Sequence, residues 1–301
     1  EDVKLVRECL HHFGQVDVAR DVAELDVISK RISYDCVILP MSFDRQDGLR
    51  IASRLRTNKE TRMVPLLMIA SDEDAVRVNK AMDIGVNDYL MRPIDALELV
   101  ARVRTQIRRK RFTDSLRENL HMSIKLATTD SVTGLYNRHY MTSQLNSLIS
   151  ASRAHDRDLS IAILDLDKFK SVNDTHGHTA GDEVLQEFAR RISQSIRGID
   201  LAARYGGEEF VVIMPDTSLD IAAKVGERLR ALTAGSAFPI SADAGQLNVT
   251  VSIGVAQLEA DDQNITTFLE RADEALYEAK HAGRNQVRVG HRSDDIIQQA
   301  S

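Results

Sequence analysis

A pair of adjacent glycines between two β-prone runs constrains the fold more than any other feature of the chain. Residues 204–210 read RYGGEEF, and the apolar run VVIM follows at 211–214. Only glycine takes the positive φ of a tight two-residue turn without a Cβ clash, so we expect a hairpin with Gly206 and Gly207 at its turn. Glu208 and Glu209 then lie beside a gap where backbone can approach a ligand closely. The hairpin therefore predicts a site that suits a metal ion and a phosphate.

A second acidic pair follows a continuous apolar strand, which we expect over residues 159–166. Asp165 and Asp167 are two positions apart, and side chains alternate along a strand, so both aspartates face the same side. Oxygen ligands without His or Cys favour Mg²⁺, which binds through one or two carboxylates and completes its shell with phosphate oxygens and water. Together with Glu208 and Glu209, these acids predict a metal ion bound to nucleotide phosphates.

The first hundred residues alternate short apolar runs with amphipathic stretches. We expect helices at 48–55 and 74–82, and strands at 16–19, 36–39, 66–69 and 88–90. Such alternation is typical of a parallel sheet covered on both faces. A helical pattern over 96–127 then acts as a connector and a dimer contact, and the basic cluster within it, 108–111, is interpreted as a solvated helix face.

A second α/β part begins near Thr129. After the strand at 159–166 and the hairpin, we expect a strand at 249–255 and helices at 181–196, 220–232 and 268–282. The predicted domains are residues 1–127, which include the connecting helix, and residues 128–290, followed by a polar tail at 291–301.

Composition narrows the class of protein. The 301 residues suffice for two domains with cores of their own, and 43% hydrophobic with 28% charged residues is typical of a soluble protein. No run is long enough to cross a bilayer, the first residues are charged rather than a signal peptide, and Cys9 and Cys36 lack partners at metal spacing. We therefore expect a cytoplasmic location without membrane contact. The net charge of −6 argues against a nucleic-acid partner.

The end of the first part resembles a response-regulator receiver domain, which implies a flavodoxin-like parallel sheet. Residues 81–90 read AMDIGVNDYL, and RPID follows at 92–95. In a working receiver, an aspartate ends the third strand, with a hydroxyl residue and a lysine around it. Here these positions fall on Pro40, Ala70 and Arg92. The resemblance thus implies a degenerate receiver kept as an adaptor or dimerisation surface.

Glu1 and Asp2 resemble the acidic pair of a receiver, which lies after the first strand of that fold. The first strand would then precede Glu1, and we expect the chain to begin inside a longer protein.

The second part resembles the GGDEF domain of diguanylate cyclases from about Thr129 to about Gly290. The resemblance rests on DSVTGLYNR at 130–138, on Asp165-Leu166-Asp167 and on the GGEEF run; Val132 departs from the usual Leu. It implies a nucleotidyl-cyclase-like central sheet and the condensation of two GTP into cyclic di-GMP with release of two pyrophosphates. It also implies two Mg²⁺ ions per active site, with Mn²⁺ as the alternative, and a homodimer in which two domains face each other.

The resemblance gives individual residues their roles. Asp165, Glu208 and the carbonyl of Leu166 would hold metal, Glu208 would accept the proton of the 3′-hydroxyl, and Glu209 would support the second ion. Lys280 and Arg284 would contact the triphosphate, and their spacing of four predicts one face of the last helix. The full set of expected GTP contacts is Phe169, Lys170, Asn173, His178, Asp182, Leu185, Lys280 and Arg284, in which Asn173 and Asp182 read guanine.

Arg197 and Asp200 match the inhibitory RxxD site of the family, and Arg228 resembles a secondary arginine of that site. Product bound there would inhibit the enzyme by holding the domains apart. Two alternatives remain open. One is a catalytically silent GGDEF module that acts as a cyclic di-GMP receptor through Arg197 and Asp200. The other is a phosphotransfer or phosphatase role of the receiver, against which Pro40 argues.

Overall fold

The structure is a computed structural model that describes residues 2–290 except 32, 242–244, 261 and 263. The chain divides into two compact units between His121 and Met122. Glu1 of the expected acidic pair and the predicted tail at 291–301 lie outside the described residues. Within the described ranges, no helix combines the length and the apolarity that a membrane span requires.

The first unit is built on a parallel sheet of order β1-β4-β5. Leu66 to Ala70 of β4 are all buried, as expected for an apolar run in the middle of a covered sheet. Asp47 begins α3 by accepting a hydrogen bond from the amide of Leu49 at 2.9 Å. The elements are α1 Asp2–Leu10, α2 Val22–Arg31, β1 Val37–Pro40, β2 Ser42–Phe43, β3 Gln46–Asp47, α3 Gly48–Thr57, β4 Leu66–Ala70, α4 Ala75–Ile84 and β5 Asp88–Met91. The parallel sheet and the strands near 36–39, 66–69 and 88–90 are confirmed.

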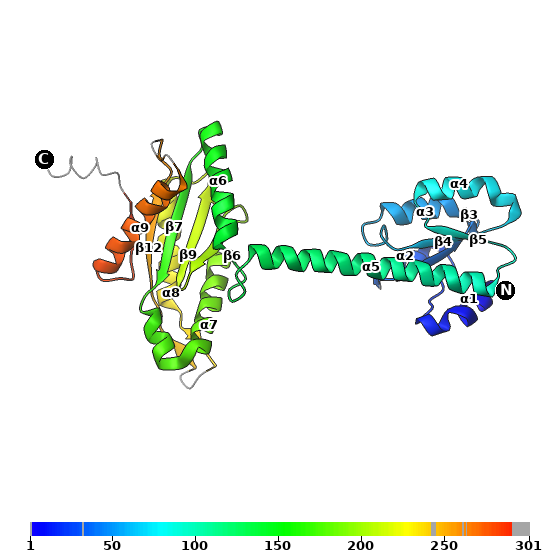
Figure 1. The fold of residues 1–301 in the computed structure, drawn as a ribbon, viewed down its shortest axis with the longest axis horizontal. Coiled ribbons are helices and arrows are strands. Elements are labelled where there is room, and N and C mark those ends of the chain that lie inside the picture. The colour runs from blue at the N-terminus through cyan, green and yellow to red at the C-terminus, as the bar shows by residue number, and fades with distance from the viewer. Residues whose placement is uncertain (1, 32, 242–244, 261, 263, 291–301) are drawn as a thin grey trace. The chain divides into compact units, whose positions relative to one another are not determined.

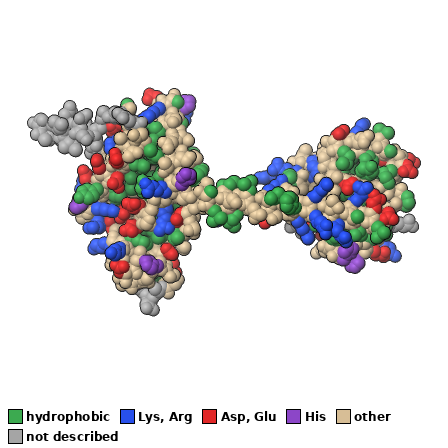
Figure 2. All heavy atoms as spheres, viewed as in Figure 1, with side chains coloured by type: hydrophobic (Ala, Val, Ile, Leu, Met, Phe, Trp, Pro, Cys, Tyr) green, Lys and Arg blue, Asp and Glu red, His purple; other side chains and the backbone are tan. Residues whose placement is uncertain are grey.

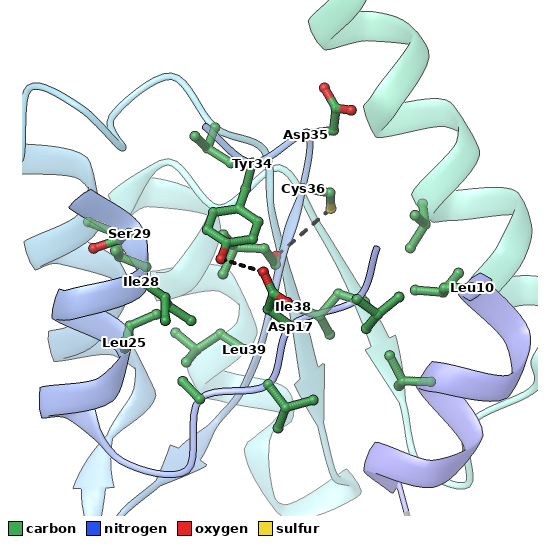
Figure 3. A pocket seen from close by; sticks show the side chains of 18 of the residues that line it. Leu10, Asp17, Leu25, Ile28, Ser29, Tyr34, Asp35, Cys36, Ile38 and Leu39 are labelled. Atoms are coloured by element: carbon green, nitrogen blue, oxygen red, sulfur yellow. Dashed lines mark hydrogen bonds between the residues drawn. The ribbon is translucent and has the colours of Figure 1, made fainter. Parts of the chain in front are cut away.

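The prediction of a strand at 16–19 is wrong, because this segment pairs with no described strand. It lines a cavity of about 610 Å³ together with the residues of β1 (Figure 3). The Tyr34 hydroxyl donates to Asp17 across this cavity at 2.8 Å, and burial together with that bond raises the pKa of Tyr34 to about 12. A run with strand-like composition becomes a strand only beside a ladder partner.

Helix α5, Ala96–Thr128, changes character along its length. Leu99, Val103 and Ile107 are buried in the core of the first unit. Further along the helix, apolar side chains lie on the surface (Figure 2). Phe112 is 66% exposed and Leu120 is 60% exposed. The helical pattern predicted for 96–127 is confirmed.

The second unit contains a six-stranded mixed sheet of order β13-β12-β7-β9-β8-β6 (Figure 1). Strand β7 is antiparallel to both of its neighbours, β9 and β12. Its side chains alternate between two hydrophobic cores: Ala162 and Leu164 pack with α7 and α8, and Ile161 and Ile163 pack with α6 and α9. The strands are β6 Tyr136–Asn137, β7 Leu159–Leu166, β8 Leu201–Gly206, β9 Glu209–Pro215, β10 Phe238–Pro239, β11 Gln246–Leu247, β12 Val251–Gln257 and β13 Val287–Val289.

The helices of this unit are α6 Arg138–His155, α7 Phe169–Ser195, α8 Leu219–Gly235 and α9 Ile265–His281. Helix α7 begins directly after β7, earlier than the expected residue 181. It is interrupted at Gly177, whose φ of 82° lies in the region that favours glycine. The break separates the two halves that carry Asn173 and Asp182.

Candidate functional site

The hairpin between β8 and β9 places its acids at the end of β7. Gly206 pairs with Glu209 in the ladder, so the central residues of the turn are Gly207 and Glu208. The expectation that both glycines form the turn is therefore wrong. Gly207 has the positive φ of 52°, whereas Gly206 remains in β8. The shift by one residue puts Glu208 itself in the turn.

Three acids and one lysine meet at this point. Asp165 lies opposite Glu209 in the β7–β9 register, and the amide of Leu166 donates to the carbonyl oxygen of Glu208 at 3.3 Å. Asp165 is only 6% exposed, and its Oδ2 is 2.7 Å from Nζ of Lys280. The structure thus brings together residues that are far apart in the sequence.

The electrostatics of the cluster favour an added cation. Burial raises the pKa of Asp165, although the hydrogen bond and charge of Lys280 offset part of this rise. Burial and the charge of Asp165 also raise the pKa of Glu208 and Glu209. Three carboxylates with raised pKa values share one ammonium group, so a divalent ion would relieve their repulsion.

The donor set fits Mg²⁺ or Mn²⁺ rather than zinc, because it consists of oxygen atoms alone. Within the described part of the chain, no group of three or more His, Cys, Asp or Glu side chains is arranged to hold a metal ion. A metal held by one or two of these carboxylates would therefore need phosphate oxygens or water to complete its shell.

Asp167 has a different task from Asp165. Its two oxygens accept hydrogen bonds from the hydroxyls of Thr250 and Ser252, both at 2.7 Å, and from the amide of Asn285 at 3.0 Å. Asp167 therefore ties β12 and the segment after α9 to the end of β7. This role of Asp167 was not predicted from the sequence. The hydroxyl residues at alternating positions 250 and 252 were the signal that could have indicated it.

Arg284 does not share a helix face with Lys280, so that part of the prediction is wrong. Helix α9 ends at His281, and Arg284 and Asn285 follow with positive φ values of 64° and 47°. The chain turns back here, which allows Asn285 to reach Asp167. Arg284 nevertheless lies near the acids, since its positive charge offsets part of the rise that burial causes in the pKa of Asp165.

The expected guanine readers lie close together across the break in α7. Asn173 packs on Gly181 so tightly that a Cβ at Gly181 would lie 1.9 Å from Oδ1 of Asn173. Asp182 is the next residue and is exposed. Of the other expected GTP contacts, Lys170 and His178 are exposed, whereas two lie in the hydrophobic core, namely Phe169 and Leu185.

A second cavity, of about 240 Å³, lies between the end of α7 and α8. Arg197, Asp200 and Arg228 line it, as does Lys224, which sequence reasoning missed. Asp200 Oδ2 accepts a hydrogen bond from the amide of Arg197 at 2.8 Å. Its Oδ1 is buried without a hydrogen-bond partner among the described residues. The cavity thus offers three cationic side chains and one unsatisfied acceptor to a ligand.

Comparison with known proteins decides the family. The model described as "Diguanylate cyclase, GGDEF domain" matches residues 127–286, more than half of the chain. The chain belongs to this family. The model described as "Response regulator receiver domain" matches residues 3–104, so the GGDEF domain is preceded by a receiver domain.

Curated relatives show the same layout. The chain is 48% identical to the response regulator PleD of Caulobacter vibrioides over 272 residues, which cover 89% of this chain and 60% of PleD. It is 43% identical to diguanylate cyclase A of Treponema denticola over 167 residues, which cover 54% of this chain and 44% of that protein. The chain thus spans less than two thirds of these relatives.

A solved structure supports the fold of the GGDEF domain. The coiled coil and GGDEF domain of DgcB from Caulobacter crescentus, in complex with cyclic di-GMP, match this chain with a TM-score of 0.57 and 32% identity. The match covers 65% of this chain and 100% of that one.

Arg92, which the resemblance places at the lysine position of a working receiver, forms hydrogen bonds within the receiver domain. The Arg92 guanidinium donates to Asp2 Oδ2 at 2.8 Å and to the Ser71 hydroxyl at 3.3 Å. Pro40 ends β1 and offers no nucleophile to a phosphoryl group. The arginine thereby neutralises the one described acid of the expected pair.

Proposed function

We propose that this GGDEF protein is a diguanylate cyclase that condenses two GTP into cyclic di-GMP with release of two pyrophosphates. The observation that carries the proposal is the cluster of Asp165, Glu208 and Glu209 at the end of β7, with raised pKa values and a single lysine. Such a cluster suits a metal-bound triphosphate and a group that accepts a proton.

GGDEF diguanylate cyclases generally use divalent metal ions. Two Mg²⁺ ions, or Mn²⁺, would be held by Asp165, Glu208, Glu209 and the Leu166 carbonyl, and would stabilise the charge on the attacking and leaving oxygens. Glu208 accepts the proton of the 3′-hydroxyl. Lys280 and Arg284 neutralise the triphosphate.

Base selection follows from Asn173 and Asp182. Asp182 accepts from N1-H and the exocyclic amine of guanine, which adenine does not present in that arrangement, and Asn173 offers its amide to the same base. We also assign to this site Phe169 and Leu185, which lie in the hydrophobic core, and Lys170 and His178, which are exposed. A site of this kind rejects ATP because its polar groups would be left unpaired.

The reaction needs a homodimer, because one GGDEF domain holds one GTP and the product joins two. The exposed apolar side chains of α5 support this step, since Phe112, Leu116, Leu120 and Ile124 recur every fourth residue and are 52–66% exposed. We assign residues 1–127 to the adaptor that brings two copies together and residues 128–290 to catalysis. Controlling the encounter of the copies then controls the rate.

Product inhibition is the proposed role of the second cavity. Arg197 and Arg228 pair with product phosphates, and Asp200 accepts from the guanine edge with its unsatisfied Oδ1. The same cavity favours a second candidate function, in which the protein is a catalytically silent receptor of cyclic di-GMP.

The two functions are separated by incubating the purified protein with GTP and Mg²⁺ and quantifying cyclic di-GMP. We expect product from the wild type and none from Glu208→Gln, while both bind cyclic di-GMP in the second cavity. A wild type that forms no product but binds cyclic di-GMP at micromolar concentration would instead be a receptor.

A further inference from the structure

The segment at the start of the GGDEF domain matched the family signature but received no chemical role from the sequence. In the structure it forms a tight turn around Asp130. The Asp130 carboxylate accepts hydrogen bonds from the amide and the hydroxyl of Thr133, at 2.9 Å and 2.7 Å, and the Asp130 carbonyl accepts from the amide of Gly134 at 2.9 Å. The carboxylate is thus held in a fixed orientation.

Arg204 connects this turn to the hairpin that carries Glu208. Its Nη1 donates to the two Asp130 oxygens at 3.2 Å and 3.3 Å, and its Nε and Nη2 both donate to the carbonyl oxygen of Gly207, at 2.9 Å and 2.7 Å. The side chains of Arg204 and Asp130 are 15% and 21% exposed, so water screens this pair less than a surface pair. Asp130 remains ionised: burial raises its pKa, but the bonds from Thr133 and the charge of Arg204 outweigh burial and lower it.

Besides Arg204, the Leu166 amide holds this turn by donating to the carbonyl oxygen of Glu208 at 3.3 Å, whereas the two glycines add no side-chain packing. A Cβ added at Gly206 or at Gly207 would meet nothing within 4 Å. Glycine also leaves the backbone free to rotate at this point. The carbonyl that Arg204 grips belongs to the peptide between Gly207 and Glu208, so the guanidinium fixes the peptide plane from which the Glu208 side chain departs.

The opposite end of this connection is the last turn of α5. Asn137 donates from Nδ2 to the carbonyl oxygen of Ala127 at 2.9 Å, and it pairs with Arg204 in the β6–β8 ladder. Asp130 is the second residue after α5. Backbone and side chain of Arg204 are therefore both anchored to residues next to the end of that helix.

We propose that Arg204 is a positioning residue that fixes the Gly207–Glu208 peptide relative to the last turn of α5, and that Asp130 acts through Arg204. The kinetic consequence rests on the proposed cyclase function, whereas the restraint on the turn does not. Without the hydrogen bonds from Arg204 to the Gly207 carbonyl oxygen, the Glu208 carboxylate moves away from the 3′-hydroxyl. A displacement of about 1 Å lowers the rate by on the order of 100-fold.

The test compares Arg204→Met, Arg204→Lys and Asp130→Asn, alone and as the double variant Arg204→Met with Asp130→Asn. We expect Arg204→Met to lower kcat about 100-fold with KM for GTP changed less than about 3-fold, because the base and phosphate contacts remain. Lysine keeps the positive charge but lacks the planar set of N–H donors of a guanidinium. The kcat of Arg204→Lys should therefore fall between those of the wild type and Arg204→Met. Asp130→Asn lowers kcat by about 10-fold and adds nothing in the Arg204→Met background.

Arg157→Met is the matched control. Arg157 pairs with Asp216 at 3.5 Å beside the opposite ends of β7 and β9, and its loss should leave kcat and KM unchanged. Additive effects of Asp130→Asn and Arg204→Met on kcat would overturn the inference, as would a loss that appears only in KM.

Hydrogen–deuterium exchange of the ligand-free protein gives a readout that does not require turnover. Peptides covering residues 203–210 should exchange faster in Arg204→Met and Asp130→Asn than in the wild type and in Arg157→Met. Cyclic di-GMP binding in the second cavity reports that each variant is folded. A wild type without cyclase activity would refute the proposed function, but the exchange experiment would still test the restraint on the turn. Unchanged exchange in both variants would overturn the inference that Arg204 and Asp130 restrain the turn.

Discussion

Replacing Gly181 with alanine tests how the proposed guanine site is built. The added Cβ would lie 1.9 Å from Oδ1 and 3.0 Å from Cγ of Asn173, and 3.2 Å from Cζ of Phe169. Real Cβ atoms essentially never approach within 3.0 Å, so Oδ1 must retreat by about 1 Å. Hydrogen bonds have a narrow range of good distances, and a shift of this size would remove Asn173 from its proposed partner on the base.

The lost contact is worth about 1–2 kcal/mol, which corresponds to a fall of about 5- to 30-fold in kcat/KM for GTP. Most of this fall should appear in KM, because Asp165 and Glu208 keep their positions. Phe169 needs to move by only a few tenths of an ångström, so we expect a loss of stability of about 1 kcal/mol.

Steady-state release of pyrophosphate measures both constants. The matched control is Gly235→Ala, since a Cβ there meets nothing within 4 Å. In the Asn173→Ala background, Gly181→Ala should cause no further loss. An unchanged KM in the single variant, or a full additional loss in the double variant, would refute a base contact by Asn173.

Four further predictions follow from the same geometry. Glu208→Gln should abolish cyclic di-GMP formation. Burial and the charge of Asp165 raise the pKa of Glu208, so ionisation of this group destabilises the wild-type fold as pH rises above 4.5. The ligand-free variant, which has no carboxyl proton to lose at this position, should therefore gain stability over the wild type in denaturant titrations across that rise in pH. Arg197→Ala should relieve product inhibition, and an inhibition curve identical to that of the wild type would contradict the role of the second cavity. Asp182→Ala should narrow the preference for GTP over ATP in initial rates, so a preserved ratio would exclude it as a base reader. Arg191→Met should lower the free energy of unfolding by about 3 kcal/mol or more without changing KM, because this 4% exposed guanidinium donates to the carbonyls of Ser236 and Ala237 and to Glu187.

Most of the fold was predictable because its signals are local. The continuous apolar run of β7 and the glycine signal of the hairpin depend on neighbouring residues only, and the bounds of β7 agree with the prediction at both ends. The failed strand at 16–19 depends on a neighbouring strand instead, which no local pattern reports. The start of α7 was missed because Asn173 and His176 weaken a helical pattern that tertiary contacts then restore.

The candidate site was predictable as a set of residues but not as an arrangement. Family spacing named Asp165, Glu208 and Lys280, whereas the ion pair of Asp165 with Lys280 joins segments that only the sheet and α9 bring together. The end of α9 was misjudged because the positive φ values after His281 are set by the return of Asn285 to Asp167, a contact 118 residues apart. The partners of Arg204 were missed for the same reason.

Helix α5 links the proposed dimer contact to the catalytic turn. Its exposed apolar side chains lie between Phe112 and Ile124, and its last turn is bound by Asn137. A change in how two copies of α5 pack would act on the reaction in two ways, through the meeting of the two sites and through the restraint that Arg204 places on Gly207. The two routes differ in their dependence on concentration. Assembly becomes limiting when the protein is dilute, whereas the restraint acts within each copy at every concentration. A variant of Arg204 should therefore lower the rate by the same factor in dilute and concentrated protein, and substitution of the apolar α5 side chains should not.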